Sequence, residues 1–244
     1  MKLFFFIYCL VMFLHGSAVQ AQPVTTEDAR SSQPSKEIKN LQALTSDIKN
    51  LVGVAEVILP NDSNAVAVEQ RLLTGFQQDP PRNLSLDNNV TLYWGWQEGQ
   101  AFIKSIAIYD SDGALRVVGA VDDIPALYNQ RSKRGIADAN EYQKLMRKYA
   151  SWGSEPSVVL FAHEAQDFNT YLPLVQRWLQ AAMLGFNVDC SKLEIAASCV
   201  FAEKVTLPIV AYKLDCKDQT TIEHCPHPLP DSQAESIPLE LFTQ

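Results

Sequence analysis

Three β-rich runs joined by short, glycine-containing connections fill the middle of this chain. The runs are residues 90–96, 101–109 and 115–121, and the connections are Gln97-Glu98-Gly99 and Asp110-Ser111-Asp112-Gly113. Connections this short join antiparallel neighbours, because a parallel pair needs a crossover of roughly a dozen residues or more. The sequence therefore predicts a three-strand antiparallel meander.

Helical patterns precede the meander. Apolar residues recur at steps of three and four over residues 38–52, which predicts a helix with one buried face. A short β-prone run follows at 54–59, and a second helix is expected to end at Phe76. Residues 77–89 contain two adjacent prolines and three asparagines, so we expect a loop there.

A helix and a buried strand follow the meander. Asp138 and Glu141 have the spacing of a capping pair at a helix start. Residues 157–162 form a continuous apolar run, which is typical of a strand buried on both faces. The helix that begins after Asp138 is expected to bury one row of side chains: Tyr142, Leu145, Met146 and Tyr149.

The rest of the pattern alternates again between helix and strand. Thr170 is the expected cap of a helix that has Pro173 in its first turn and Gly185 after its end. Two further strands are expected near 193–201 and 206–214. This alternation predicts a mixed sheet with helices packed on it, in the fold class α/β or α+β.

The first 21 residues have the form of a secretory signal peptide. One positive residue, Lys2, precedes an apolar core, and small residues end the segment at Ala21. The apolar run is shorter than the roughly 20 residues that span a bilayer, so we expect cleavage and no remaining transmembrane anchor. The mature protein is then periplasmic or secreted. Its expected parts are a flexible leader at 22–35, a single mixed α/β domain at 36–215 and a disulfide-pinned tail at 216–244.

The mature chain is acidic. Cleavage after Ala21 leaves 19 basic and 28 acidic residues, since the removed segment holds one basic and no acidic side chain. An acidic surface repels phosphate backbones and anionic lipid headgroups, so nucleic acid is not expected as a partner. We expect a protein partner in the envelope or the extracellular space, and no cofactor.

Four cysteines lie in the last quarter of the chain: Cys190, Cys199, Cys216 and Cys225. An even number in an exported chain predicts two disulfides, and the sequence does not choose among the three possible connectivities. Zinc is the alternative, because Cys216 and Cys225 lie close to His224 and His227, and zinc prefers thiolate and imidazole ligands. The spacing matches no standard zinc finger, so we expect disulfides and no metal.

Charged residues directly follow two of the predicted strands. Asp122 and Asp123 come after the third meander strand, and His163 and Glu164 come after the apolar strand. Ligands of open α/β sheets gather at the carboxyl ends of strands, where carboxylates with an imidazole can hold a divalent metal or move protons. Parallel strands would bring these residues into a hydrolase-type site. Otherwise Asp123 caps a helix, and His163 and Glu164 are polar loop residues.

Three further motifs have both a structural and a functional interpretation. Asp110-Ser111-Asp112-Gly113 resembles half of a calcium loop, but it offers too few oxygens and a hairpin turn is favoured. The basic cluster Arg131-Ser132-Lys133-Arg134-Gly135 is expected to be a solvated loop, with an anion contact or a protease-sensitive linker as the alternatives. Trp94 and Trp96 share one strand face, where they fill the core or, if exposed, form a binding surface.

Residues 205–210 (Val-Thr-Leu-Pro-Ile-Val) follow a predicted strand and a long helix. This order resembles the second half of a thioredoxin-like domain, in which the proline that opens the strand is cis. The reactive C-x-x-C of that family is absent. The resemblance therefore implies a redox-inactive version, of the kind found among secretion and conjugative pilus assembly proteins.

No strong catalytic motif is present in the chain. The sequence favours a non-catalytic, exported, disulfide-stabilised protein that acts as an interaction or assembly module in the cell envelope or secretion machinery. A hydrolase that uses the strand-end residues and a thioredoxin-like assembly protein are the alternatives.

Overall fold

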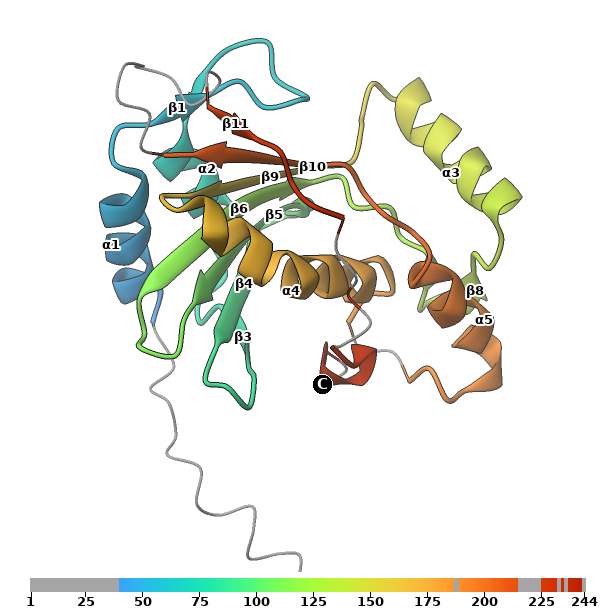
Figure 1. Cartoon of the computed structure of the whole chain (residues 1–244). Coiled ribbons are helices and arrows are strands. Elements are labelled where there is room, and N and C mark those ends of the chain that lie inside the picture. Colours follow the sequence, from blue (N-terminus) through green and yellow to red (C-terminus); the bar gives the residue numbers. More distant parts are fainter. Residues whose placement is uncertain (1–39, 187–188, 215–224, 232–233, 235–236, 243–244) are drawn as a thin grey trace, which may run out of the picture. The chain divides into compact units, whose positions relative to one another are not determined.

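The computed structural model describes residues 40–186, 189–214, 225–231, 234 and 237–242, all within one compact unit, Ile38–Gln244. A mixed sheet of seven strands runs through it in the order β11-β10-β9-β6-β5-β4-β3 (Figure 1). Helices pack on this sheet, which confirms the predicted fold class. Within the described residues, no helix is both long and apolar enough to cross a bilayer.

The predicted meander is confirmed, and it has a fourth strand at its edge. Its strands, each antiparallel to the next, are β3 (Arg82–Ser85), β4 (Thr91–Gln97), β5 (Gln100–Tyr109) and β6 (Leu115–Asp122). The prediction of a loop throughout 77–89 is therefore wrong for the residues of β3. Pro80 and Pro81 precede β3, so their missing N–H groups remove no hydrogen bond of the ladder. Leu84 lies opposite Leu92 of β4 and is buried, which gives this edge strand a core contact.

The remaining strands lie on the other side of β6. β9 (Ser157–Ala162) pairs antiparallel with β6 and parallel with β10 (Ile209–Lys213). All six residues of β9 are buried, as its continuous apolar run predicts. The expected cis bond before Pro208 is not found, since the cis peptide bond among the described residues joins Asp79 to Pro80.

α1 (Leu41–Val52) and α2 (Val68–Thr74) cover one face of the sheet and confirm the two predicted helices. Asn40 caps α1 by accepting a hydrogen bond of 2.9 Å from the backbone N–H of Ala43. The connection between these helices contains a small ribbon of β1 (Glu56–Val57) and β2 (Val66–Ala67). The core on this face includes Leu44, Ile48, Leu72, Tyr93, Tyr109 and Phe161.

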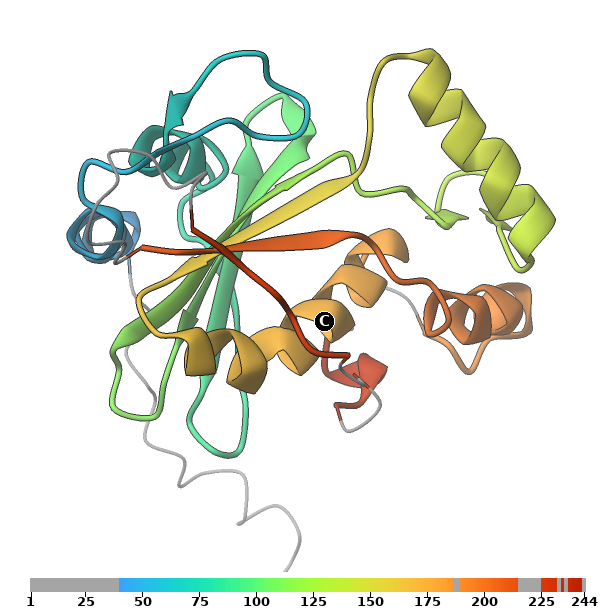
Figure 2. The same ribbon diagram turned by 45° about the horizontal axis from the view of Figure 1, so that its top comes forward.

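α4 (Ala165–Met183) covers the opposite face of the sheet (Figures 1 and 2). It begins before its expected cap, and Thr170 lies inside it, where the hydroxyl donates to the carbonyl of Gln166. Pro173 is therefore an interior residue of the helix and not a first-turn residue. Gly185 follows the helix in the left-handed region, as predicted. The core on this face includes Trp94, Ile106, Leu160, Phe168, Val175 and Trp178.

α5 (Leu193–Ala202) replaces the strand that was predicted near 193–201. Its buried residues include Ile195, Cys199 and Ala202, which recur at steps of four and three. The prediction followed the apolar content of the segment, which does not distinguish a strand from a helix of this length. Alanine and glutamate within it favour the helix.

The described part of the C-terminal region packs more closely than a tail held only by cysteines. β11 (Pro226–His227) extends the sheet beyond β10 as a short antiparallel strand. The 3-10 helix η4 (Leu239–Phe242) places Leu239 and Phe242 in the core beside α4. These contacts make both segments part of the folded unit.

α3 (Ala139–Ser151) stands at one end of this unit, next to α5 (Figure 2). Asp138 caps it as predicted, because its carboxylate accepts hydrogen bonds from the N–H groups of Asn140 and Glu141. The hairpin of β7 (Tyr128–Asn129) and β8 (Arg134–Gly135) precedes it. Every residue of α3 is described and none is buried, so the prediction of a buried stripe is wrong.

Candidate functional site

The four residues of the predicted hydrolase site lie at opposite ends of two antiparallel strands. Asp122, at the end of β6, is opposite Ser157 at the start of β9. His163 follows the other end of β9, about 20 Å away along the strand. The predicted site needs β6 and β9 to be parallel. Because they are antiparallel, Asp122 and Asp123 do not meet His163 and Glu164.

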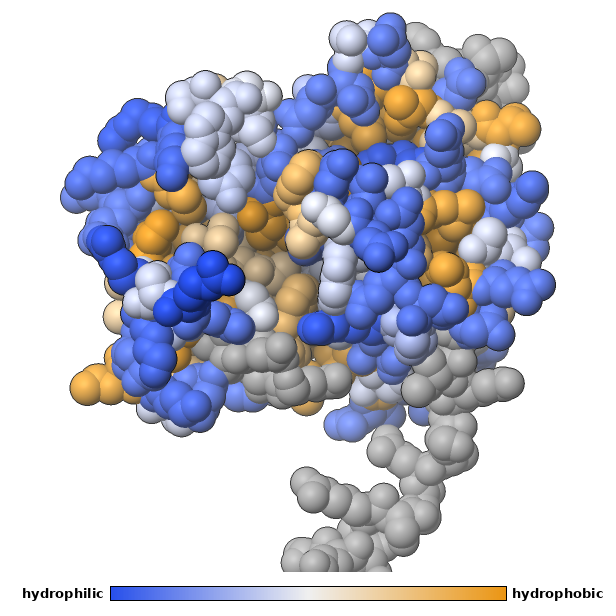
Figure 3. All heavy atoms as spheres, turned by 180° about the vertical axis from the view of Figure 1, so that it is seen from behind, coloured by the Kyte–Doolittle hydropathy of each residue, from blue (hydrophilic) through white to orange (hydrophobic). Residues whose placement is uncertain are grey.

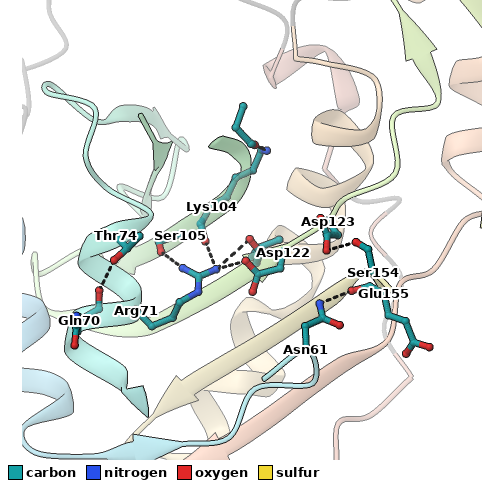
Figure 4. A network of polar contacts seen from close by, with 12 residues as sticks. Asn61, Gln70, Arg71, Thr74, Lys104, Ser105, Asp122, Asp123, Ser154 and Glu155 are labelled. Carbon is teal, nitrogen blue, oxygen red and sulfur yellow. Dashed lines mark hydrogen bonds and ion pairs between the residues drawn. The ribbon is translucent and has the colours of Figure 1, made fainter. Parts of the chain in front are cut away.

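Asp122 forms an ion pair with Arg71 of α2 (Figure 4). Nη2 of Arg71 lies 2.6 Å from Oδ1 of Asp122, and the two side chains are 11% and 15% exposed. The same guanidinium donates to the carbonyls of Lys104 and Val121, both at 3.3 Å, and to the hydroxyl of Ser105 at 3.4 Å. Burial raises the pKa of Asp122, although Arg71 acts in the opposite direction. These contacts hold α2 against the sheet.

Asp123 turns the chain away from the end of β6. Its φ of +55° is in the left-handed region, which aspartate tolerates better than most residues. Its carboxylate accepts a hydrogen bond from the hydroxyl of Ser154, which lies just before β9 (Figure 4). Nearby, Asn61 Nδ2 donates to the carbonyl of Glu155 at 2.8 Å. Asp123 therefore ties two loops together and does not cap a helix.

The Asp110-Ser111-Asp112-Gly113 segment is a hairpin turn, as favoured by the sequence. The Asp110 carboxylate accepts hydrogen bonds from the backbone N–H groups of Asp112 and Ala114, and from Arg116 Nε at 2.6 Å. Partial burial acts to raise the pKa of Asp110, but these hydrogen bonds lower it below its usual value. The carboxylate stabilises the turn between β5 and β6.

His163 and Glu164 belong to the same end of the sheet as this turn. Both lie near Asp167 in the first turn of α4, as do Asp110 and Arg116. Burial raises the pKa of Asp167, and Arg116 opposes that shift. Among the described residues, no group of three or more histidine, cysteine, aspartate or glutamate side chains is placed to hold a metal ion.

The two tryptophans of β4 have different surroundings. Trp94 is buried and stacks on Phe186, with 5.4 Å between ring centroids, so it is a core residue. Trp96 is half-buried under the guanidinium of Arg82, 5.0 Å from the ring centroid. Trp94 therefore fills the core, which was one of its two expected roles, and it is not part of an exposed binding surface. Trp96 alone of the pair is accessible, and the Arg82 guanidinium partly covers its ring.

Cys190 and Cys199 are joined by a disulfide, which connects the segment before α5 to that helix. Cys225 is also disulfide-bonded. The remaining predicted residue of this set, Cys216, lies outside the described residues, and so does His224 of the zinc alternative.

The basic cluster forms the turn between β7 and β8 and both residues of β8. Arg131, Lys133 and Arg134 are exposed, as expected for a solvated loop. Gly135 lies directly against α5, where an added Cβ would overlap the hydroxyl of Ser198. The hairpin of β7 and β8 therefore packs on α5, and it is not part of the seven-strand sheet.

A small cavity of about 110 Å³ lies between α4 and the segment that leads to β10. The charged residues that line it are Arg177, which is buried, and Glu203. Arg177 donates to Glu203 at 2.9 Å, to the side-chain carbonyl of Gln180 at 3.0 Å and to the carbonyl of Ala234 at 3.1 Å. These bonds tie α4, the end of α5 and the C-terminal region together. The cavity is therefore a gap between packed elements of the fold.

A larger groove of about 380 Å³ separates α3 from the segment before β10. Its walls are mostly apolar, and Figure 3 shows hydrophobic atoms in a hollow on the side where α3 lies. The residues that line it are Tyr142, Met146, Arg147 and Ala150 of α3, Ser154, Glu155 and Pro156 before β9, and Leu207 and Pro208 before β10.

Aromatic side chains of α3 are only partly covered. The ring of Tyr142 contacts Phe201 of α5 at 5.9 Å between centroids, and burial raises its pKa. Tyr149 contacts Trp152 at the same distance, and the Lys148 ammonium lies 4.8 Å from the centre of the Trp152 ring. Trp152 itself is 63% exposed. The sequence did contain a signal for this groove, the amphipathic stripe of α3, but the stripe was expected to be buried.

Comparisons of the chain with protein-family models, with curated proteins and with solved structures give no match.

Proposed function

We propose that this protein is an exported, disulfide-stabilised, non-catalytic module that binds another protein of the cell envelope or extracellular space. The signal-peptide pattern of residues 1–21 supports export. The disulfide between Cys190 and Cys199 is compatible with an oxidising compartment, where such bonds persist.

The groove beside α3 is the observation that carries the proposal. It combines an apolar lining with half-buried Tyr142 and Met146, and it lies on a helix that contributes nothing buried to the core. Tyrosine and methionine are enriched at protein interfaces, and anchor side chains of a partner dock in pockets of this kind. A helix with an apolar stripe gains stability when a partner covers that stripe.

The charged residues give no comparable support for catalysis. Asp122 is paired with Arg71, Asp123 accepts the Ser154 hydroxyl, and His163 lies at the far end of β9. An acid–base or metal site needs such groups within hydrogen-bond reach of one reacting atom. A protein-binding role requires only an accessible apolar surface, such as the groove beside α3.

Site-specific photocrosslinking in cells that produce the full-length chain tests the proposal. A photoreactive phenylalanine analogue at Ala150, which is exposed in the groove, should give a discrete protein adduct. The same analogue at Asn50, exposed on α1, is the matched control and should not give that adduct. The adduct should also disappear when Pro208 on the facing wall is replaced by Gln. Absence of an adduct at Ala150, or identical adducts from both positions, would overturn the proposal.

A further inference from the structure

The turn between β7 and β8 carries three cations within four residues. Arg131, Lys133 and Arg134 are exposed, and so is Ser132 among them. The exposed run begins at Asn129 and continues without interruption to Arg134. Exposed loop tips with polar side chains are the preferred sites of proteolytic cleavage in folded proteins. This turn therefore combines access for a protease with a dense set of basic side chains.

The hairpin of β7 and β8 can open without disturbing the sheet. Each of its strands has two residues, and their pairing is separate from the seven-strand sheet. Lys133 has a φ of +50°, in the left-handed region that is unfavourable for a residue with a Cβ. Opening the turn relieves this conformation and breaks few hydrogen bonds. Local opening of the turn is therefore expected to be far more frequent than unfolding of the whole unit.

We propose that residues 131–135 are a processing site, at which a serine protease of basic specificity cuts the chain. Cleavage after Arg134 places cations at the first, second and fourth positions before the scissile bond, where acidic specificity pockets of a protease can hold them. Gly135 follows the bond and has no side chain to obstruct the protease. The inference uses the export of the chain, which is part of the proposed function, but it does not use the groove.

The reaction is hydrolysis of the peptide bond between Arg134 and Gly135. The oxygen of one water joins the carbonyl carbon of Arg134, the C–N bond breaks, and the protons of the water leave an ammonium on Gly135 beside the new carboxylate. The two parts should stay together, because β6 before the cut pairs with β9 after it. Both cores also contain residues of both parts. After cleavage α3 is joined covalently to the sheet only through residues 152–156.

The other basic residues of the described chain are held more firmly. Lys192 lies inside the loop that the disulfide between Cys190 and Cys199 closes. Lys204 donates its N–H to the carbonyl of Phe201 and is followed by the buried Val205. A protease needs an extended segment, which helices and sheet strands do not release locally. Ten basic residues lie in such elements: Lys49, Arg71, Arg82, Lys104, Arg116, Lys144, Arg147, Lys148, Arg177 and Lys213.

Trypsin, which cuts after lysine and arginine, probes the site in the purified full chain. Mass spectrometry of the early products should place the first cut within residues 40–214 after one of the three cations of the turn. The two fragments should co-elute in native size-exclusion chromatography and separate in denaturant. Replacing the three cations by glutamine should slow this cut at least about tenfold. The matched triple on α3, Lys144→Gln, Arg147→Gln and Lys148→Gln, should change its rate by less than about twofold.

A first cut elsewhere within residues 40–214, or equal effects of the two triple variants, would overturn the inference. Cuts before residue 40 or after residue 214 are scored separately, since those positions lie outside the described residues. Circular dichroism confirms that each variant is folded.

Two further variants test whether the cut follows local opening of the hairpin. Gly135→Ala should speed it by about tenfold, because a Cβ would overlap the Ser198 hydroxyl and lift the hairpin from α5. Leu44→Ala destabilises the core on the other face of the sheet and leaves the hairpin alone, so it should change the rate by less than about twofold. Equal acceleration by both variants would mean that cleavage requires global unfolding, which overturns the inference.

Material exported by the cells that make this protein tests the processing itself. Mass spectrometry should find chains that begin at Gly135, and the triple glutamine variant of the turn should yield none. Exported chains that are all intact across residues 131–135 would overturn the inference, even if trypsin cuts the purified chain there. Crosslinking at Ala150 does not depend on this site. Loss of that adduct rejects the proposed function alone, and absence of a Gly135 terminus rejects the processing alone.

Discussion

Arg71 Nη2 lies 2.6 Å from Asp122 Oδ1, and this ion pair joins α2 to the end of β6. The two residues are 51 positions apart in the chain, yet both are largely withdrawn from water. A carboxylate at the end of a strand resembles a catalytic group when only its own segment is considered. Here the guanidinium of Arg71 pairs with the Asp122 carboxylate, so Asp122 has a structural role.

Removal of Arg71 tests this assignment. Arg71→Met leaves the Asp122 carboxylate buried without its charge partner, so we expect the free energy of unfolding to fall by about 3–5 kcal/mol. Urea denaturation measures this change. The control is Lys49→Met: Lys49 lies 3.9 Å from Glu69 and is exposed, so its loss should cost at most about 0.5 kcal/mol. Similar losses in both variants would contradict the structural role of Arg71.

The stability of the fold should decline at high pH because of Tyr109. Its ring is 1% exposed and its hydroxyl donates to Asp47 at 2.8 Å. Burial, and then the hydrogen bond to Asp47, raise its pKa well above the ordinary value of about 10. The folded state therefore keeps the proton that the unfolded state loses, and the stabilisation present below pH about 10 is lost as the pH rises above it.

Tyr109→Phe provides the comparison for this pH dependence. At neutral pH the variant loses the hydrogen bond, at a cost of about 1 kcal/mol. Above pH about 10 the wild type should lose up to about 1.4 kcal/mol per pH unit more steeply than the variant. Denaturant titrations at a series of pH values measure both slopes. Parallel curves for the two proteins would show that Tyr109 does not retain its proton in the fold.

Close packing of the hairpin on α5 should make Gly135 sensitive to substitution. A Cβ at this position would overlap the Ser198 hydroxyl, and Ser198 is buried, so Gly135→Ala should cost about 1–3 kcal/mol. Removing the obstructing side chain with Ser198→Gly should make the alanine better tolerated. A double-mutant cycle measures this coupling. Additive losses in the double variant would mean that the two residues do not meet.

The disulfide before α5 should contribute measurably to stability. Cys190 and Cys199 close a short loop, and in the chain-entropy model such a crosslink is worth about 2–3 kcal/mol. The paired Cys190→Ser and Cys199→Ser variant should lose this amount in thermal or urea unfolding. Unchanged stability, or an equal effect of reductant on the variant and the wild type, would count against the contribution.

Local patterns predicted the elements whose partners are close in the chain. The meander of β4, β5 and β6 follows from β-rich runs and short turns, and the cap of α3 follows from Asp138 and its neighbours. α5 was missed because its apolar residues suit a strand as well as a helix, and only the structure shows which of them are buried together. β3 was missed because turn-forming residues surround it.

The site was harder to predict than the fold, because it depends on which elements become neighbours. No local feature of Asp122 and His163 shows that β6 and β9 run in opposite directions. The stripe of α3 was visible in the sequence, since Tyr142 and Met146 recur at a helical step. Such a stripe identifies the apolar face of a helix, but it does not show whether the chain itself covers that face.

No side chain of α3 is buried, and Tyr142 is the one residue of this helix that packs against a core, so the other residues along it can be exchanged without opening a void in either core. The α3 wall of the groove is thus largely separate from the cores, whereas on the facing wall Leu207 lines the groove and also belongs to the core beside α4. Related chains could diverge in what they recognise while keeping the same scaffold, and the groove could be redesigned for a new target on the same terms.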